Sequence, residues 1–114
     1  MNIEEYRDFC LSLRGATESF PFGDDTLVMK LKDKVFSLAS LDGPFSFNVK
    51  CDPEKAVDLR EHYSDVQPGY HMNKRHWNTI HVTGAVPDVK LKEWILDSYN
   101  LILNSLPKKL RIDI

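Results

Sequence analysis

The feature that most constrains how this chain can fold is an alternation of apolar and polar side chains that starts at residue 26. Segments 26–32 and 45–50 carry it, segment 35–41 lies between them, and short turn sequences separate the three. A period of two is typical of strands with one buried face, and such turns join antiparallel neighbours. The sequence therefore predicts a three-stranded meander. Its buried side comprises Leu27, Met29, Leu31, Phe45, Phe47 and Val49, and its open side includes Val28, Lys30, Ser46 and Asn48.

Helical spacing flanks the predicted meander. Asn2 and Glu5 match a capping box, and apolar residues recur three and four positions apart over 3–14, before Gly15. Asp52 and Pro53 match the cap and first-turn proline of a second helix, and Asp88 is the predicted cap of a last helix. The other segments are predicted as a linker (16–25), a strand (78–83) and a frayed basic tail (107–114).

These elements predict a single α+β domain over residues 1–114. Helices would cover one face of an antiparallel sheet in a two-layer fold, with one or two strands after the second helix. The composition agrees with this, because 42% hydrophobic and 28% charged residues are close to average globular usage.

Charge and cysteine content restrict the function classes. A net charge of −2 gives no global attraction to nucleic acid or to an anionic membrane, so any anion site must be local. No apolar run approaches the roughly 20 residues that a membrane span needs. The first residues do not resemble a signal peptide, which favours a cytoplasmic protein with Cys10 and Cys51 reduced; a disulfide between them is the less favoured alternative.

The most unusual stretch is 66–87, which contains no acidic residue. Cations, amides and aromatic rings gather in it, a mixture that suits an anion, because Lys and Arg attract phosphate while rings stack on bases. The competing interpretation is structural: Tyr70 and Trp77 fill the edge of the core while the cations keep a loop hydrated. The candidate binding residues here are His71, Asn73, Lys74, Arg75, His76 and Trp77.

Other chemistry has weaker support. His71, His76 and His81 recur every five residues, a spacing that fits neither one face of a helix nor one face of a strand, so we expect no metal site. Neither cysteine has a histidine placed beside it by a local motif, and no glycine-rich phosphate loop is present. We therefore expect no enzyme activity and no cofactor. An acidic ridge of Glu4, Glu5, Asp8, Asp24 and Asp25 is expected to meet solvent.

Several strings resemble the MmcQ/YjbR-like family. The most specific is Met-Asn-Lys-Arg-His-Trp-Asn-Thr at 72–79, and the resemblance extends over nearly the whole chain. Further matching strings are Pro-Phe-Gly at 21–23, Lys-Val-Phe at 34–36, Asn-Val-Lys-Cys at 48–51, Val-Pro-Asp at 86–88 and Leu-Pro-Lys-Lys at 106–109.

This resemblance implies an α-β(3)-α-β(2)-α order, similar in layout to secretion chaperones and to CyaY-like (frataxin) proteins. It also implies a DNA-binding role, since hairpins in the family are likened to a double wing.

Three functional hypotheses follow. In the first, DNA binds weakly and without sequence preference: Lys74, Arg75, Lys108 and Lys109 meet phosphates, while His71, Asn73, His76 and Trp77 lie nearer the bases or sugars. In the second, the open sheet face or the aromatic loop binds a protein partner or a second copy of the chain. In the third, a small ligand binds at the loop 70–77.

Overall fold

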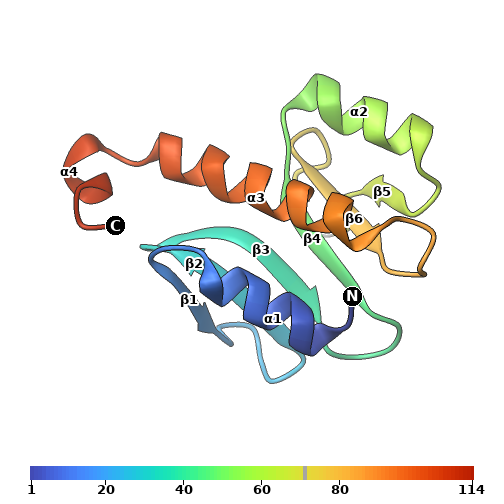
Figure 1. The fold of residues 1–114 in the computed structure, drawn as a ribbon, viewed down its shortest axis with the longest axis horizontal. Coiled ribbons are helices and arrows are strands. Elements are labelled where there is room, and N and C mark those ends of the chain that lie inside the picture. The colour runs from blue at the N-terminus through green and yellow to red at the C-terminus, as the bar shows by residue number, and fades with distance from the viewer. Residues whose placement is uncertain (71) are drawn as a thin grey trace.

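The computed structural model describes residues 1–70 and 72–114 and has an α+β fold (Figure 1). A six-stranded antiparallel sheet has the order β1-β2-β3-β4-β6-β5, and helices pack on it. The elements are α1 (Ile3–Ser12), β1 (Ala16–Ser19), β2 (Thr26–Leu31), β3 (Lys34–Ser40), β4 (Ser46–Lys50), α2 (Pro53–His62), β5 (Val66–Pro68), β6 (Trp77–His81), α3 (Asp88–Ser105) and α4 (Lys108–Arg111).

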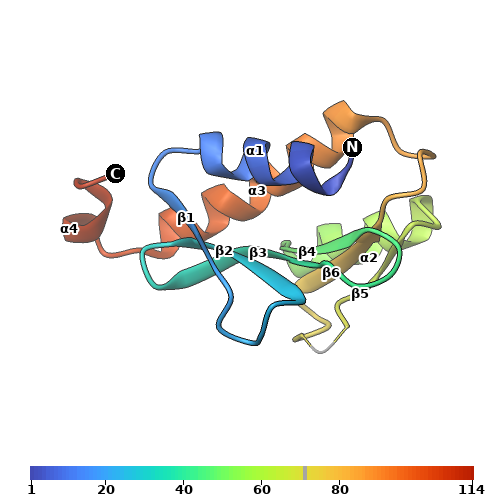
Figure 2. The same ribbon diagram turned by 90° about the horizontal axis from the view of Figure 1, so that it is seen from below.

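The helices cover one face of this sheet. Figure 2 shows α1 and α3 on one side of the strands, while the connection between β1 and β2 projects from the other side. The α2 helix lies beside α3 over the β5–β6 edge: Tyr63 makes an edge-to-face contact with Trp94, and the Asn78 side chain donates to the Ala56 carbonyl oxygen. The core between helices and sheet includes the fully buried Tyr6, Phe36, Phe47 and Ile80.

A β-bulge in β3 allows neighbouring residues of this strand to contact α1 and α3. Met29 pairs with Ser37 and Lys30 with Val35, which leaves Phe36 as an extra residue. Consecutive side chains therefore reach the helix side: the Phe36 ring packs edge-on against Tyr99, and the Ser37 hydroxyl is 2.7 Å from that of Tyr6.

The predicted helix caps are confirmed at two of three sites. Asn2 and Glu5 form a capping box, and Asp52 accepts from the backbone N–H of Lys55. The third cap prediction is wrong, because Pro87 occupies the cap of α3 and no side chain bonds there. Asp88 is instead the first helical residue, and its carboxylate lies 2.7 Å from the N-terminal ammonium group of Met1.

The sheet contains one strand, β1, in addition to the three-stranded meander and the two strands after α2. Residues 16–19, predicted as part of a linker, form β1 and pair with β2 from Ala16↔Leu31 to Ser19↔Val28. The order is therefore α-β(4)-α-β(2)-α before the short α4, and both strands expected after the second helix are present as β5 and β6. The tail, predicted to fray, forms α4, and Ile114 packs against the core.

Both cysteines are buried free thiols. Burial raises the pKa of the Cys10 thiol to about 12 and also raises the pKa of Cys51. Since the thiolate is the reactive form, neither side chain is suited to nucleophilic chemistry near neutral pH. In the described part of the chain, no helix has the length and apolar character to cross a membrane.

Candidate functional site

The acid-free segment forms β5, the loop 72–76 and β6. Asn73 organises the described part of the loop: its carbonyl oxygen accepts from the backbone N–H groups of His76 and Trp77, and its Oδ1 accepts from that of Arg75 at 3.0 Å. Asn73, Lys74 and Arg75 are exposed, while His76 and Trp77 are half-buried. The turn therefore presents two cations to solvent on a hydrogen-bonded backbone.

Arg60 of α2 donates hydrogen bonds to this loop and to β6. Its Nε donates to Asn78 Oδ1 at 2.6 Å, and its Nη2 donates to the carbonyl oxygens of Lys74 and Trp77. All three acceptors are neutral, so the guanidinium charge is hydrogen-bonded but not neutralised by them. Arg60 was not predicted as a site residue, because an arginine on an exposed helix carries no sequence signal that its partners lie in a later loop.

Gly69 allows the start of the loop to pass close to β6. A Cβ at this position would lie 2.8 Å from the Cβ of Trp77 and 2.9 Å from its carbonyl oxygen. The backbone N–H of Gly69 donates to that oxygen at 2.8 Å. Trp77 is therefore a structural neighbour of the turn as well as a candidate binding residue, which supports both interpretations of this residue.

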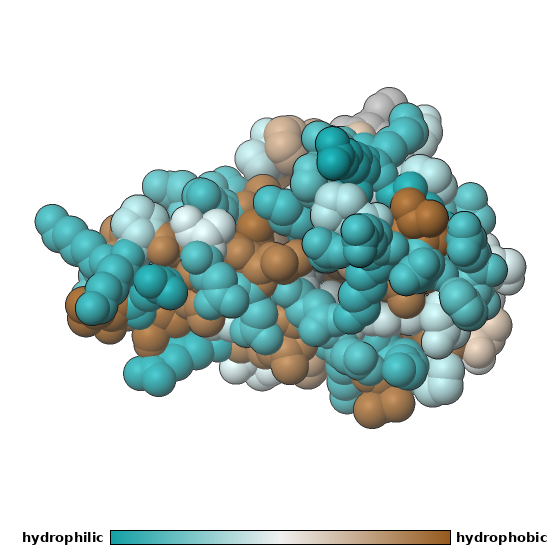
Figure 3. Space-filling view, turned by 90° about the horizontal axis from the view of Figure 1, so that it is seen from above, coloured by the Kyte–Doolittle hydropathy of each residue, from teal (hydrophilic) through white to brown (hydrophobic). Residues whose placement is uncertain are grey.

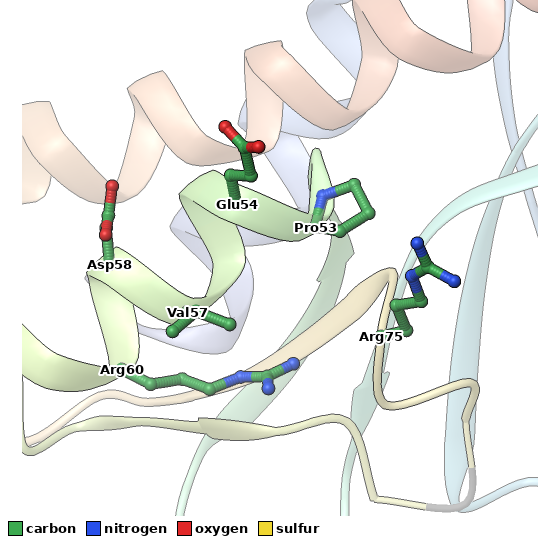
Figure 4. A pocket seen from close by; sticks show the side chains of 6 residues that line it. All are labelled: Pro53, Glu54, Val57, Asp58, Arg60 and Arg75. Atoms are coloured by element: carbon green, nitrogen blue, oxygen red, sulfur yellow. The ribbon is translucent and has the colours of Figure 1, made fainter.

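A shallow pocket of about 520 Å³ lies between α2 and the loop. Figure 4 shows the Arg60 and Arg75 side chains extending into the space between α2 and the loop, whereas Glu54 and Asp58 point away from them. Around α2, Figure 3 shows hydrophilic residues separating small apolar areas. The cationic wall of the pocket is therefore formed by two arginines from different elements.

The other predicted binding residues do not all gather here. Lys108 and Lys109 are exposed on α4, which lies well apart from the loop before β6 in both Figure 1 and Figure 2. His76 lies in the loop and His81 is exposed at the end of β6, whereas His71 lies outside the described residues. Among residues 1–70 and 72–114, no three His, Cys, Asp or Glu side chains are placed to hold a metal ion.

The open face of the sheet adjoins the loop. Strand register places Val28, Lys30, Leu38, Asn48, Lys50 and Thr79 on this face, opposite the helices. The Thr79 hydroxyl donates to Asn48 Oδ1 and accepts from the backbone N–H of Tyr70 at 3.0 Å, so β4, β6 and the start of the loop are connected there. Val28 is fully buried although it was predicted to lie on the open side, because Ser19, Leu38 and the β1–β2 connection lie on that side as well.

A second pocket, of about 480 Å³, lies on this open face. Phe22 of the β1–β2 connection and Tyr70 of the later loop both line it, and each is 70% exposed. Its other lining residues come from three adjacent strands and the loop: Thr26, Val35, Leu38, Ser40, Asn48 and Met72. This pocket was not predicted, because its walls come from segments almost fifty residues apart in the chain.

The comparisons with known proteins agree with this architecture. The family model YjbR matches residues 11–101. The chain belongs to the YjbR family. It is 31% identical over 112 residues to YjbR of Escherichia coli K12, covering 97% of this chain and 95% of that protein. It is also 37% identical over 91 residues to YbdF of Escherichia coli O157:H7, covering 79% of this chain and 75% of that one.

Solved structures of similar proteins share the fold. The crystal structure of Deinococcus radiodurans protein DR2400 matches with a TM-score of 0.90 at 34% identity, over 98% of this chain and 86% of that one. A crystal structure from Pseudomonas syringae matches with a TM-score of 0.78 at 25% identity, over 89% and 98%. The two Escherichia coli relatives are described as uncharacterized proteins, so membership in the YjbR family establishes the fold and not an activity.

Proposed function

We propose that this YjbR-family protein binds DNA weakly and without strong sequence preference, through the loop 72–76, the adjacent Trp77 and the adjoining open sheet face. One observation carries the proposal: the cations of this region have no carboxylate partner among the described residues. They are Lys30, Lys50, Arg60, Lys74 and Arg75. Cations without a carboxylate partner attract a polyanion, whereas paired cations are largely neutralised.

The arrangement also limits the affinity. Arg60 is committed to Asn78 and to two loop carbonyl oxygens, which leaves four cations able to reach phosphates. About four contacts give a slope of log K against log salt of about −3 to −4 for duplex DNA. With a net charge of −2, the rest of the protein adds no attraction, so binding should be measurable mainly at low salt.

A titration of fluorescently labelled DNA at about 50 mM salt tests this, followed by the same titration at about 200 mM. We expect a rise in anisotropy at low salt, and a double substitution Lys74→Ala/Arg75→Ala should reduce the salt slope by about 2. The charge-matched control is Lys108→Ala/Lys109→Ala, which changes the net charge equally on α4. Equal losses of DNA affinity in both double variants would indicate attraction by overall charge. Absence of DNA binding by the unmodified protein would refute the proposal.

A further inference from the structure

The pocket on the open face lies beside the cations of the proposed DNA surface. Lys30 is directly opposite Val35 across the β2–β3 pair, and Lys50 follows Asn48 on the same face of β4. Val35 and Asn48 both line the pocket, so a lysine flanks it on the β2 side and another on the β4 side. No carboxylate is among the lining residues; Asp25 contacts one of them, accepting a 3.5 Å hydrogen bond from Thr26.

The interior of the pocket suits a flat ring with a polar edge. Two aromatic side chains, Phe22 and Tyr70, line it from different loops, and Val35 and Leu38 make part of its lining apolar. Asn48 Oδ1 is used by the Thr79 hydroxyl, while the Asn48 Nδ2 has no acceptor among the residues that the structure describes. An amide donor near apolar and aromatic surface is what a heteroaromatic ring with a carbonyl or ring-nitrogen acceptor requires.

We propose that this pocket takes an unpaired base of single-stranded DNA, with Phe22 and Tyr70 as stacking surfaces and Asn48 Nδ2 as a donor to the base edge. This inference rests on the proposed function and specifies its substrate. Lysines on both sides of the pocket favour a strand over a mononucleotide, because a chain that crosses the pocket has a phosphate on each side of the base. A duplex keeps its bases stacked and paired, so it would meet the cations and leave the pocket empty.

Phe22→Ala and Tyr70→Ala are the decisive variants, because both side chains are 70% exposed and their removal should leave the fold intact. The matched control is Phe20→Ala, which removes a ring from the same β1–β2 connection but does not line the pocket. Each protein is titrated with a labelled thymidine strand of about 12 nucleotides, with the corresponding duplex, and with free thymidine monophosphate followed by amide chemical shifts.

We expect tighter binding of the single strand than of the duplex, and a loss of about 5- to 100-fold in single-strand affinity for each pocket variant. Duplex binding and the Phe20→Ala variant should stay within about twofold of the unmodified protein. Equal binding of both DNA forms, with no effect of the pocket variants, would overturn the pocket as the site of an unpaired base. The proposed DNA binding itself would still stand. Binding of thymidine monophosphate alone would overturn the DNA strand as occupant, and no binding of any probe would overturn both proposals.

Discussion

All four ion pairs of the described residues involve the helical side of the sheet, whereas the cations of the open face and its loop have none. On the helical side, Arg7 pairs with Glu18 at 2.6 Å, and Lys55 of α2 pairs with Asp97 of α3 at 2.7 Å. On the open side, Lys30 and Lys50 are half-buried and lie beside an apolar pocket. One side of the sheet therefore uses its charges in ion pairs, while the cations of the other side have no carboxylate partner among the described residues.

The largest expected difference between the faces is in stability. Phe47 is fully buried and packs against Tyr6 and Phe45, so Phe47→Ala should lower the free energy of unfolding by about 3–5 kcal/mol. Phe22→Ala, which removes the same ring from the open face, should change it by less than about 0.5 kcal/mol. Urea denaturation of both variants measures this. Comparable losses of unfolding free energy in the two variants would mean that Phe22 is part of the core. The two faces of the sheet would then not differ in their contribution to stability.

The next effect concerns Arg60, which joins the two regions. Arg60→Ala removes the donors to Asn78 and to the loop carbonyl oxygens, and should cost about 2 kcal/mol. The backbone N–H groups of His76 and Trp77 should exchange with solvent faster, as hydrogen exchange can show. Arg75→Ala is the matched control, because Arg75 is exposed and its side chain forms no hydrogen bond among the described residues. Unchanged hydrogen exchange in Arg60→Ala would show that the loop backbone is stable without the Arg60 hydrogen bonds.

The smallest expected effect is the pH dependence of the Arg7–Glu18 pair. The hydrogen bond from Arg7 lowers the pKa of Glu18 below its ordinary value of 4.5. Its contribution is therefore fully present above about pH 4.5 and is lost as the pH falls through the lowered value. Glu18→Gln should make acid denaturation slightly less steep, and the control Glu54→Gln should not. Because the pair is exposed, the difference should be close to the limit of a careful titration.

Local patterns account for what the sequence could predict. The capping box of Asn2 and Glu5, the Asp52-Pro53 helix start and the alternating strands each depend on residues a few positions apart. The 16–19 strand was missed because Ala-Thr-Glu-Ser has no apolar alternation; its pairing with β2 makes it a strand. The Asp88 cap was misassigned because Pro87 and Asp88 are both acceptable at a helix start.

The candidate site was only half predictable for the same reason. The cationic loop is visible as a continuous string in the sequence, and Lys74 and Arg75 are exposed in the structure; their role as contact residues stays a prediction. Arg60 acts on residues 14 and more positions away in the chain, and the open-face pocket needs the sheet to bring Phe22 near Tyr70. Long-range contacts of this kind have no period or spacing that a single sequence displays.

The bulge at Phe36 has a consequence for how relatives should be aligned. Val35 and Leu38 are three positions apart, an odd spacing, and yet both line the open-face pocket, because the extra residue shifts the in-and-out parity of the strand. A family member with one residue fewer at this point would keep both positions on the open face, two residues apart, but would turn only one side chain here toward the helices. The presence of this single insertion in an alignment would therefore report whether a relative can contact both α1 and α3 from neighbouring residues of this strand, as Ser37 and Phe36 do.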